Sequence, residues 1–407
     1  MTKHILVILD GASEPTTGGA RTTLEDATLS NIDSMARRSL CGVARTAPQD
    51  VQPDSLICLL TILGISLTSC EVVGRAALEA AAHGIAPTLG SPVVRCNLVR
   101  VADGRLTDFT GGVPSRTAEQ IAAALSETFP TLRVGQAYRH FLLPEDTFEV
   151  LSSIHFSEPH EHIGELVSGL LPWSTSIEAQ GAVDRLHSLV EMSARLCTGF
   201  GYHGLMLWPW GLSRAPRLPS FASLYGTNGA CVCGIDLMDG IARGLSLDVV
   251  RPVGATGGWN TDLSAKVAST LQLLSTHNLV FVHINGADEA AHIRDPRLKR
   301  DFMERVDRMF IGPLINGLEA GQEPYRILLC PDHHTSPADG RHKMGTVPFL
   351  LYDSDAERTG VRHFDEPSAA ETAYRAESSL LSMLLSDTCL QRSADNRSSR
   401  GQERSAE

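Results

Sequence analysis

Long apolar runs are missing from this sequence. No stretch reaches the roughly 18 consecutive apolar residues that a membrane-spanning helix needs. Residues 1–4 lead directly into a strand-like run, without the pattern of a signal peptide. We therefore expect a cytoplasmic protein with no membrane partner.

Paired cysteines are also missing. The nine cysteines include no CxxC pair, and the two closest, Cys231 and Cys233, are spaced CxC. An odd and scattered set is typical of reduced thiols in a cytosolic protein, not of a disulfide framework or a zinc knuckle.

Positive charge is scarce, because 35 lysines and arginines face 47 acidic residues and the formal net charge is −12. This balance argues against a nucleic-acid partner. It does not exclude a small anionic ligand, since a local group of arginines can oppose the overall sign. The 407 residues, 43% of them hydrophobic, have the composition of a soluble globular chain with room for two domains.

Residues that can bind metal ions follow one of the apolar runs. Residues 279–284 read LVFVHI, which predicts a buried strand. Asp288 and His292 come soon after it and are four apart, so on a helical turn they would share one face. A carboxylate and an imidazole placed in this way can bind one ion, although such pairs also occur by chance.

Aspartates and histidines also flank three further apolar runs, at 5–9, 326–331 and 347–352. These residues are Asp10, Asp332, His333, His334 and His342. In open α/β sheets, sites form beyond the carboxyl ends of the strands, so a shared site is expected there. The structural alternatives are a helix cap for Asp10 and ordinary loop positions for the histidines.

Ser55 stands between a polar loop and the apolar, helix-like run 56–63. Local sequence favours a serine that caps the helix N-terminus. The functional alternative is a nucleophile whose attacked phosphate lies at that N-terminus.

The pattern of predicted strands and helices changes twice along the chain. In residues 1–72 and 219–386, predicted strands alternate with predicted helices. The helices are expected at 24–38, 235–244, 263–274, 301–319 and 369–386. Residues 73–218 instead combine a strand at 93–101, a hairpin turn at Asp103-Gly104, and helices at 117–125 and 176–196. This pattern predicts a discontinuous α/β domain with an α+β insert. The polar residues 387–407 are expected to be a disordered tail.

A set of short motifs runs along the chain to about residue 385. They are ILDG at 8–11, PDS at 53–55, LTILG at 60–64, GRAALEA at 74–80, RCNLV at 95–99, YRH at 138–140, WPWG at 208–211, GATG at 254–257, DEAAH at 288–292, DH at 332–333 and VPF at 347–349. In this order, the set resembles the archaeal-type, cofactor-independent (2,3-bisphosphoglycerate-independent) phosphoglycerate mutases of the alkaline-phosphatase superfamily.

The resemblance implies an α/β fold with an alkaline-phosphatase-like doubly wound sheet and an inserted α+β domain that binds substrate and acts as a lid. It also implies a two-metal phosphotransferase that interconverts 3-phosphoglycerate and 2-phosphoglycerate, a step of glycolysis, through a phosphoserine at Ser55. One metal would be held by Asp288, His292 and His342, and the other by Asp10, Ser55, Asp332 and His333.

The resemblance extends to the ligands. The family commonly uses Mn²⁺, and the alternatives are Mg²⁺, Co²⁺ and Zn²⁺. The substrate would be a small anionic, phosphorylated hydroxy acid. Its expected contacts in the insert are Arg75, Arg95, Arg139, His140 and His160. The oligomeric state is not predicted.

Several residues near these motifs depart from the family pattern. They are Leu56, Leu59, Asp239, Asn285, Glu161, Lys343 and the pair Gly345-Thr346. These departures leave two other enzymes open: a transferase of specialised metabolism that moves a phosphoryl or phosphonyl group to a glycerate-like hydroxy acid, and a metal-dependent phosphate or phosphonate ester hydrolase. A binding protein without catalytic activity is a further alternative.

Overall fold

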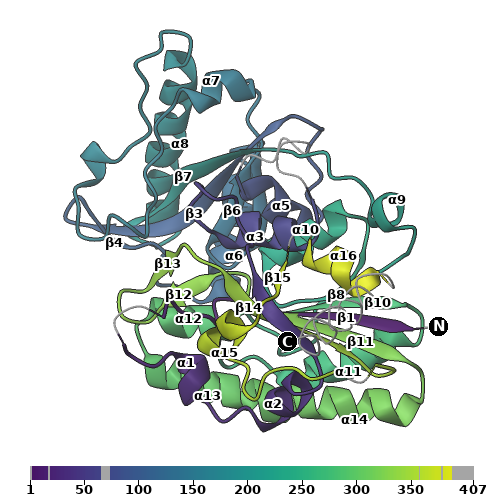
Figure 1. Ribbon diagram of the computed structural model, residues 1–407. Coiled ribbons are helices and arrows are strands. Elements are labelled where there is room, and N and C mark those ends of the chain that lie inside the picture. Colours follow the sequence, from purple (N-terminus) through teal and green to yellow (C-terminus); the bar gives the residue numbers. More distant parts are fainter. Residues whose placement is uncertain (1, 17–18, 66–73, 357, 377–378, 387–407) are drawn as a thin grey trace, which may run out of the picture. The chain divides into compact units, whose positions relative to one another are not determined.

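The strands predicted at 5–9, 279–284, 326–331 and 347–352 lie in one eight-stranded sheet (Figure 1). The computed structural model describes residues 2–16, 19–65, 74–356, 358–376 and 379–386. The strand order of the sheet is β15 (Arg375–Ala376), β2 (Leu40–Ala44), β14 (Val347–Asp353), β11 (Tyr325–Cys330), β1 (Lys3–Leu9), β10 (Leu279–Ile284), β8 (Ala230–Val232) and β9 (Asp248–Val250). The central strands β11, β1 and β10 are parallel, and β14 is antiparallel to β11. The carboxyl ends of the three parallel strands therefore meet at one edge.

Helices cover both faces of this sheet, as Figure 1 shows. On one face lie α2 (Ser30–Ala36), α11 (Leu263–Leu274), α13 (Pro296–Val306) and α14 (Gly312–Gly321). The other face carries α9 (Phe221–Tyr225) and α16 (Leu380–Leu385), with Phe221 packed edge-on against Phe281 of β10. Burial on both faces explains why the parallel strands read as continuous apolar runs. The predicted doubly wound α/β class is confirmed.

Three of the predicted helices are interrupted. The helix expected at 24–38 is two helices, α1 (Thr23–Asp26) and α2. A capping box of Thr22 and Glu25 starts the first helix. The second starts where the buried Asp307 carboxylate accepts hydrogen bonds from the amides of Asn31 and Ile32. The helix expected at 369–386 is α15 (Glu366–Glu371) and α16, separated by β15, which pairs with β2.

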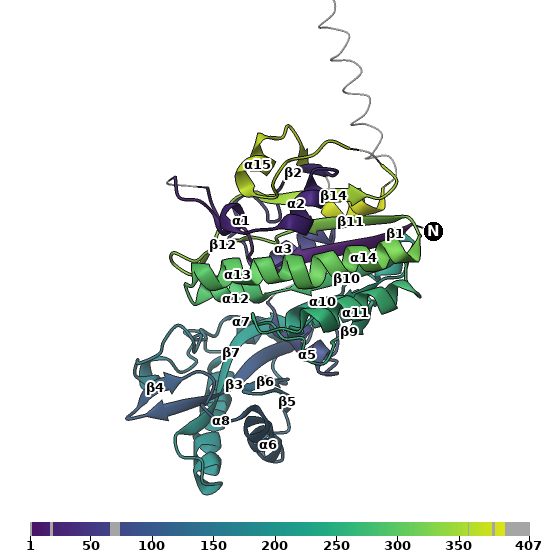
Figure 2. The same ribbon diagram turned by 90° about the horizontal axis from the view of Figure 1, so that it is seen from below.

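The helix expected at 301–319 is longer and composite. It begins at Pro296, because Asp295 accepts a hydrogen bond from the Leu298 amide, and a π-helical turn (Asp307–Ile311) joins α13 to α14. Figure 2 shows α13 and α14 as one continuous rod. Two further described helices of this region are α3 (Ser55–Ile62) and α12 (Gly286–His292), and α10 (Asp236–Gly244) follows β8 in the chain.

The described residues divide into two compact units. Unit 1 holds those within Met1–Ser69, Ser220–Met238 and Ser246–Glu407, and unit 2 those within Cys70–Pro219 and Asp239–Leu245. Residues 239–245, which we expected in the metal-binding domain, thus pack within unit 2. The expected boundary at 72–73 and the tail at 387–407 lie outside the described residues.

Unit 2 is built on a five-stranded antiparallel sheet. Its strands are β3 (Pro92–Ala102), β4 (Arg105–Asp108), β5 (Leu132–Gln136), β6 (Arg139–Leu142) and β7 (Leu205–Arg214). The predicted hairpin joins β3 to β4, and Asp103 and Gly104 both have positive φ, as a tight hairpin turn requires. The helices are α5 (Ala76–Ala82), α6 (Ser115–Ser126), α7 (Phe148–Ser152) and α8 (Gln180–Gly199); α8 begins four residues later than predicted.

Among the residues that the structure describes, none of the helices combines the length and apolar character that crossing a membrane requires.

Asp307 provides a test of this packing. Its carboxylate is buried and accepts hydrogen bonds from the amides of Asn31 and Ile32, at 3.1 and 2.8 Å. Asp307→Ala leaves both amides without that acceptor, so we expect the free energy of unfolding to fall by about 2 kcal/mol. Urea titration measures the loss. The control is Asp301→Ala, on the exposed face of α13, which should stay within about 0.5 kcal/mol of the parent; an equal loss in both variants would contradict the capping role.

Candidate metal centre and nucleophile

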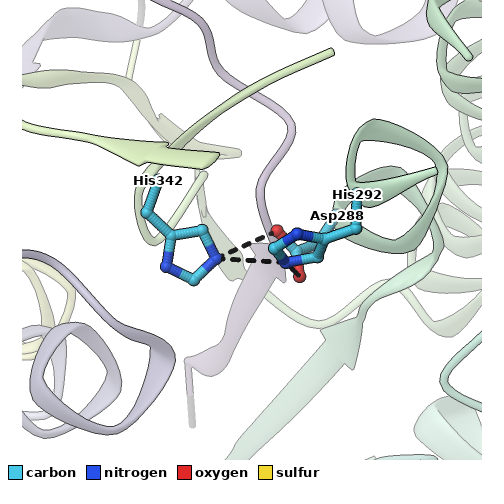
Figure 3. Close-up of side chains that lie close together, drawn as sticks. All are labelled: Asp288, His292 and His342. Carbon is cyan, nitrogen blue, oxygen red and sulfur yellow. Dashed lines mark hydrogen bonds and ion pairs between the residues drawn. The ribbon is translucent and has the colours of Figure 1, made fainter. Parts of the chain in front are cut away.

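Asp288 and His292 lie on the short helix α12, which begins directly after β10. The predicted spacing of four puts both side chains on one face, and Asp288 Oδ2 lies 3.1 Å from His292 Nε2. The third member, His342, comes from β13 (Arg341–Lys343), and its Nε2 lies 3.5 Å from Asp288 Oδ1. Figure 3 shows both imidazoles turned toward the Asp288 carboxylate.

Backbone carbonyls orient these two imidazoles. His292 Nδ1 lies 2.8 Å from the Gly340 carbonyl oxygen, and His342 Nδ1 lies 3.1 Å from that of Pro53. A carbonyl oxygen only accepts, so each Nδ1 carries the proton. Each Nε2 is thereby directed to Asp288, and the two Nε2 atoms are 3.3 Å apart. Such anchoring of the second ring nitrogen is typical of metal-binding histidines.

A second cluster shares Asp288. Ligand atoms of Asp10, Asp288 and His333 all lie within 4.8 Å of one another, as do those of Asp288, His292 and His342. His333 Nε2 is 3.6 Å from Asp10 Oδ1 and 3.2 Å from Asp332 Oδ2. We expected Asp288 in one metal site only, whereas the structure places its carboxylate in both clusters.

Burial perturbs the charges of this region. Asp10, Asp332 and His333 are almost completely buried. Burial, reinforced by the charge of Asp288, raises the pKa of Asp332 to about 7, although amides of Gly11 and His333 oppose the shift. Burial lowers the pKa of His333 to about 3, so this imidazole is neutral.

The pKa of Asp288 is shifted in the opposite direction to that of Asp332. Burial alone would raise its pKa, but hydrogen bonds from His292 and His342 hold it well below its usual value. Asp288 in turn raises the pKa of His292 to about 9. Against the effect of burial, it also raises the pKa of His342. A proton on His292 therefore offsets the Asp288 charge.

This donor set suits two divalent cations. Carboxylate oxygens and unprotonated Nε2 atoms are ligands that Mn²⁺, Zn²⁺ and related ions accept. A cation near Asp288 would take the place of the proton that His292 holds there. A second would offset the buried charges of Asp10 and Asp332, which neutral His333 cannot do. The residues present therefore fit the two ions that the family resemblance implies.

Ser55 is the first residue of α3, with only 7% of its surface exposed. The helix cap is Asp54, whose side chain accepts from the Ile57 amide at 2.8 Å, so the structural alternative for Ser55 is wrong. The Ser55 hydroxyl lies 3.3 Å from His333 Nε2. It is thus beside the second cluster and at a helix N-terminus, where a phosphate is favoured.

The residues expected to bind substrate lie in unit 2, and most of them belong to one group. Arg95 lies 4.6 Å from the centre of the Trp210 ring, and His160 contacts the edge of that ring. Glu79 pairs with Arg95, at 2.7 Å from Nε, and with Arg75, at 3.5 Å. The contacts continue through Phe109 and Tyr138 to Arg139.

His140 is separate from this group. Its side chain is completely buried, and burial, aided by the nearby His83, lowers its pKa to about 4. It accepts a hydrogen bond from the Gly135 amide at 3.3 Å. This interior position gives a structural role to a residue that we expected to contact substrate.

The departures from the family pattern occupy several environments. Leu59 is completely buried and Leu56 is 5% exposed. The Asp239 carboxylate is buried and pairs with Arg243 one turn later on α10. Asn285 donates to the Gly257 carbonyl at 2.9 Å. Lys343 lines a pocket beside His333, together with Arg45.

Two residues that contact the proposed metal ligands were not identified from the sequence. His283 Nε2 lies 3.0 Å from Asp10 Oδ2, and Thr335 Oγ1 lies 2.7 Å from Asp288 Oδ1. The histidine interrupts an otherwise apolar strand, which was a usable signal. Thr335 has no comparable signal, because its partner is distant in the sequence.

Comparison with known proteins defines the class. The model of the metalloenzyme superfamily matches residues 2–378. The structure is similar to that of a protein from Pyrococcus horikoshii (TM-score 0.67, 21% identity, 92% of both chains). It is also similar to the cofactor-independent phosphoglycerate mutase from Thermoplasma acidophilum (TM-score 0.60, 22% identity, 97% of this chain and 100% of that one). The protein is a metalloenzyme with this fold.

Curated relatives give the family. The chain is 34% identical to the 2,3-bisphosphoglycerate-independent phosphoglycerate mutase of Methanothrix thermoacetophila, over 91% of this chain and 96% of that one. It is 30% identical to the probable 2,3-bisphosphoglycerate-independent phosphoglycerate mutase of Geobacter sulfurreducens, over 94% and 99%. The chain belongs to the family of 2,3-bisphosphoglycerate-independent phosphoglycerate mutases.

Gly11 tests how tightly the centre is packed. A Cβ atom there would lie 2.4 Å from Asp288 Oδ1 and 2.7 Å from Thr335 Oγ1, and its φ is +61°. We expect Gly11→Ala to displace Asp288 and weaken Mn²⁺ binding by about 10-fold or more, measured by calorimetric titration. Gly19, with a φ of +74° and nothing within 4 Å, is the matched control. Unchanged Mn²⁺ affinity in Gly11→Ala would contradict the described geometry.

Proposed function

We propose that this protein is a metal-dependent phosphotransferase that interconverts 3-phosphoglycerate and 2-phosphoglycerate through a phosphoserine at Ser55. The observation that carries the proposal is the position of Ser55. Ser55 is the first residue of a helix, and its hydroxyl lies within hydrogen-bonding distance of His333. The surrounding buried carboxylates and imidazoles form a donor set that suits two cations. The activities of the relatives support the same reaction.

The metals would be held by the two clusters that share Asp288. We propose one ion on Asp288, His292 and His342, and the other among Asp10, Ser55, Asp332 and His333, with Asp288 between them. When bound, two divalent cations neutralise phosphoryl oxygens and lower the pKa of a serine hydroxyl. Mn²⁺ is the ion we propose to test first.

The protein's own groups assist at Ser55. The N-terminus of α3 favours the negative charge of a phosphoryl group. Arg45 and Lys343 line the pocket beside His333; Arg45 adds positive charge there, while the Lys343 ammonium is paired with Asp339. The positive charge of Arg45 thus supports an anionic substrate.

The transfer is balanced in two steps. Ser55 gives up its hydroxyl proton and its oxygen attacks phosphorus, the bond from phosphorus to the glycerate oxygen breaks, and that oxygen takes a proton. The other hydroxyl of the retained glycerate then gives up its proton and attacks the phosphoserine, the bond from phosphorus to the Ser55 oxygen breaks, and that oxygen takes a proton, which restores the serine. Retention of glycerate and exclusion of water separate this reaction from hydrolysis.

We propose that unit 2 holds the glycerate. Arg95, fixed between Glu79 and the Trp210 ring, is oriented before substrate arrives. Its Nε and Nη2 groups are already paired with Glu79, so we propose that its remaining N–H groups donate to the carboxylate of glycerate. Arg75, Arg139 and His160 are the other proposed contacts.

An assay with Mn²⁺ and 3-phosphoglycerate, following both 2-phosphoglycerate and free phosphate, tests the proposal. We expect 2-phosphoglycerate at between about 1 and 10³ turnovers per second. Free phosphate as the sole product would identify a hydrolase. If neither product forms while Mn²⁺ is bound, the pocket accepts another donor, and the proposed substrate is wrong.

Ser55→Ala tests the nucleophile. The variant lacks the oxygen that accepts the phosphoryl group, so we expect the rate to fall by about 10⁴-fold or more. Its circular dichroism spectrum should match the parent, since the change is small. Substantial activity in Ser55→Ala would rule out the phosphoserine route.

A further inference from the structure

Thr335 connects the two clusters through one hydroxyl group. This residue of β12 (His334–Ser336) is completely buried. Its Oγ1 lies 2.7 Å from Asp288 Oδ1 and 3.1 Å from His333 Nδ1. The carboxylate common to both clusters and the imidazole next to Ser55 thus share a single hydrogen-bonding partner.

The directions of these hydrogen bonds follow from counting protons. A hydroxyl has one hydrogen, and an ionised carboxylate can only accept, so Thr335 donates to Asp288. Toward His333 the hydroxyl must then act as the acceptor, which places the imidazole proton on Nδ1. His333 Nε2 is left unprotonated, and this is the atom that faces Ser55, Asp10 and Asp332.

Buried charges fix the backbone of Thr335. Lys299 of α13 is completely buried, and its Nζ donates to the Thr335 carbonyl and to Glu14 Oε1, both at 2.9 Å. The Thr335 amide donates to the Ser13 carbonyl at 3.0 Å. Glu366 holds the same loop by accepting from the Ser13 hydroxyl and the Glu14 amide. The strand is therefore held on both sides, against the loop that follows Asp10.

We propose that Thr335 is a positioning residue for both metal clusters, with Lys299 holding it in place. The hydroxyl sets the tautomer of His333 and orients Asp288, so both sites are preorganised together. This inference rests on the proposed two-metal function. It predicts that loss of one oxygen atom outside the ligand sets weakens Mn²⁺ binding.

The test is calorimetric titration of the full chain with Mn²⁺ alone, for Thr335→Val and Thr335→Ser. Valine keeps the shape and removes the hydroxyl, so we expect binding to weaken by about 10- to 100-fold, the usual effect of losing such a partner. Serine keeps the hydroxyl and should restore affinity to within a few-fold of the parent.

Thr270→Val is the matched control. Thr270 is also completely buried, and its hydroxyl donates to the Lys266 carbonyl within α11 at 2.7 Å. We expect it to leave Mn²⁺ affinity unchanged, even where its melting temperature falls as far as that of Thr335→Val. If Thr335→Val does not fold, Thr335→Ala takes its place.

The outcomes separate this inference from the function on which it rests. If the parent binds two Mn²⁺ ions and the variant without the hydroxyl binds them equally well, the positioning role is wrong. Equal weakening in the valine and serine variants, or in Thr270→Val, would show a general packing effect and also overturn it. If the parent itself does not bind Mn²⁺, the proposed two-metal function fails.

Discussion

The concentration of buried carboxylates at the carboxyl ends of three parallel strands is the constraint on which this structure depends. Asp10, Asp288 and Asp332 follow β1, β10 and β11, and parallel pairing brings the three strand ends together. Isolated ionised carboxylates are costly to bury, so the surrounding groups must supply positive charge or protons. The raised pKa values of Asp332 and His292 show that protons serve this purpose in part. Two cations would do so more completely.

The loops around these strand ends are arranged to keep these ligands close. Gly11 leaves room for Asp288, and Gly286 lets α12 approach the Phe302 ring, which a Cβ would meet at 2.5 Å. Backbone carbonyls of Gly340 and Pro53 orient two imidazoles, and Thr335 orients a third. The ligands thus come from distant parts of the chain, but each is held by a second contact. Such preorganisation is what a phosphoryl-transfer centre requires.

Much of this arrangement could be predicted from sequence because it is local. The apolar runs identified β1, β10, β11 and β14, and the spacing of Asp288 and His292 predicted a shared helical face. The interrupted helices were missed because tertiary contacts decide them, as with Asp307, which caps α2 from another helix. The shared position of Asp288 and the hydroxyl of Thr335 were missed for the same reason. Neither periodicity nor motif spacing reports a contact between a helix residue and a strand residue that are 47 positions apart.

The most direct test of the central claim is the anomalous scattering of Mn²⁺ in crystals of the full chain. The account predicts two peaks, one on each side of the Asp288 carboxylate. One should lie among Asp288, His292 and His342, and the other beside Asp10, His333 and Ser55. A single peak, or two peaks that do not share Asp288, would contradict the claim that this carboxylate joins two metal sites.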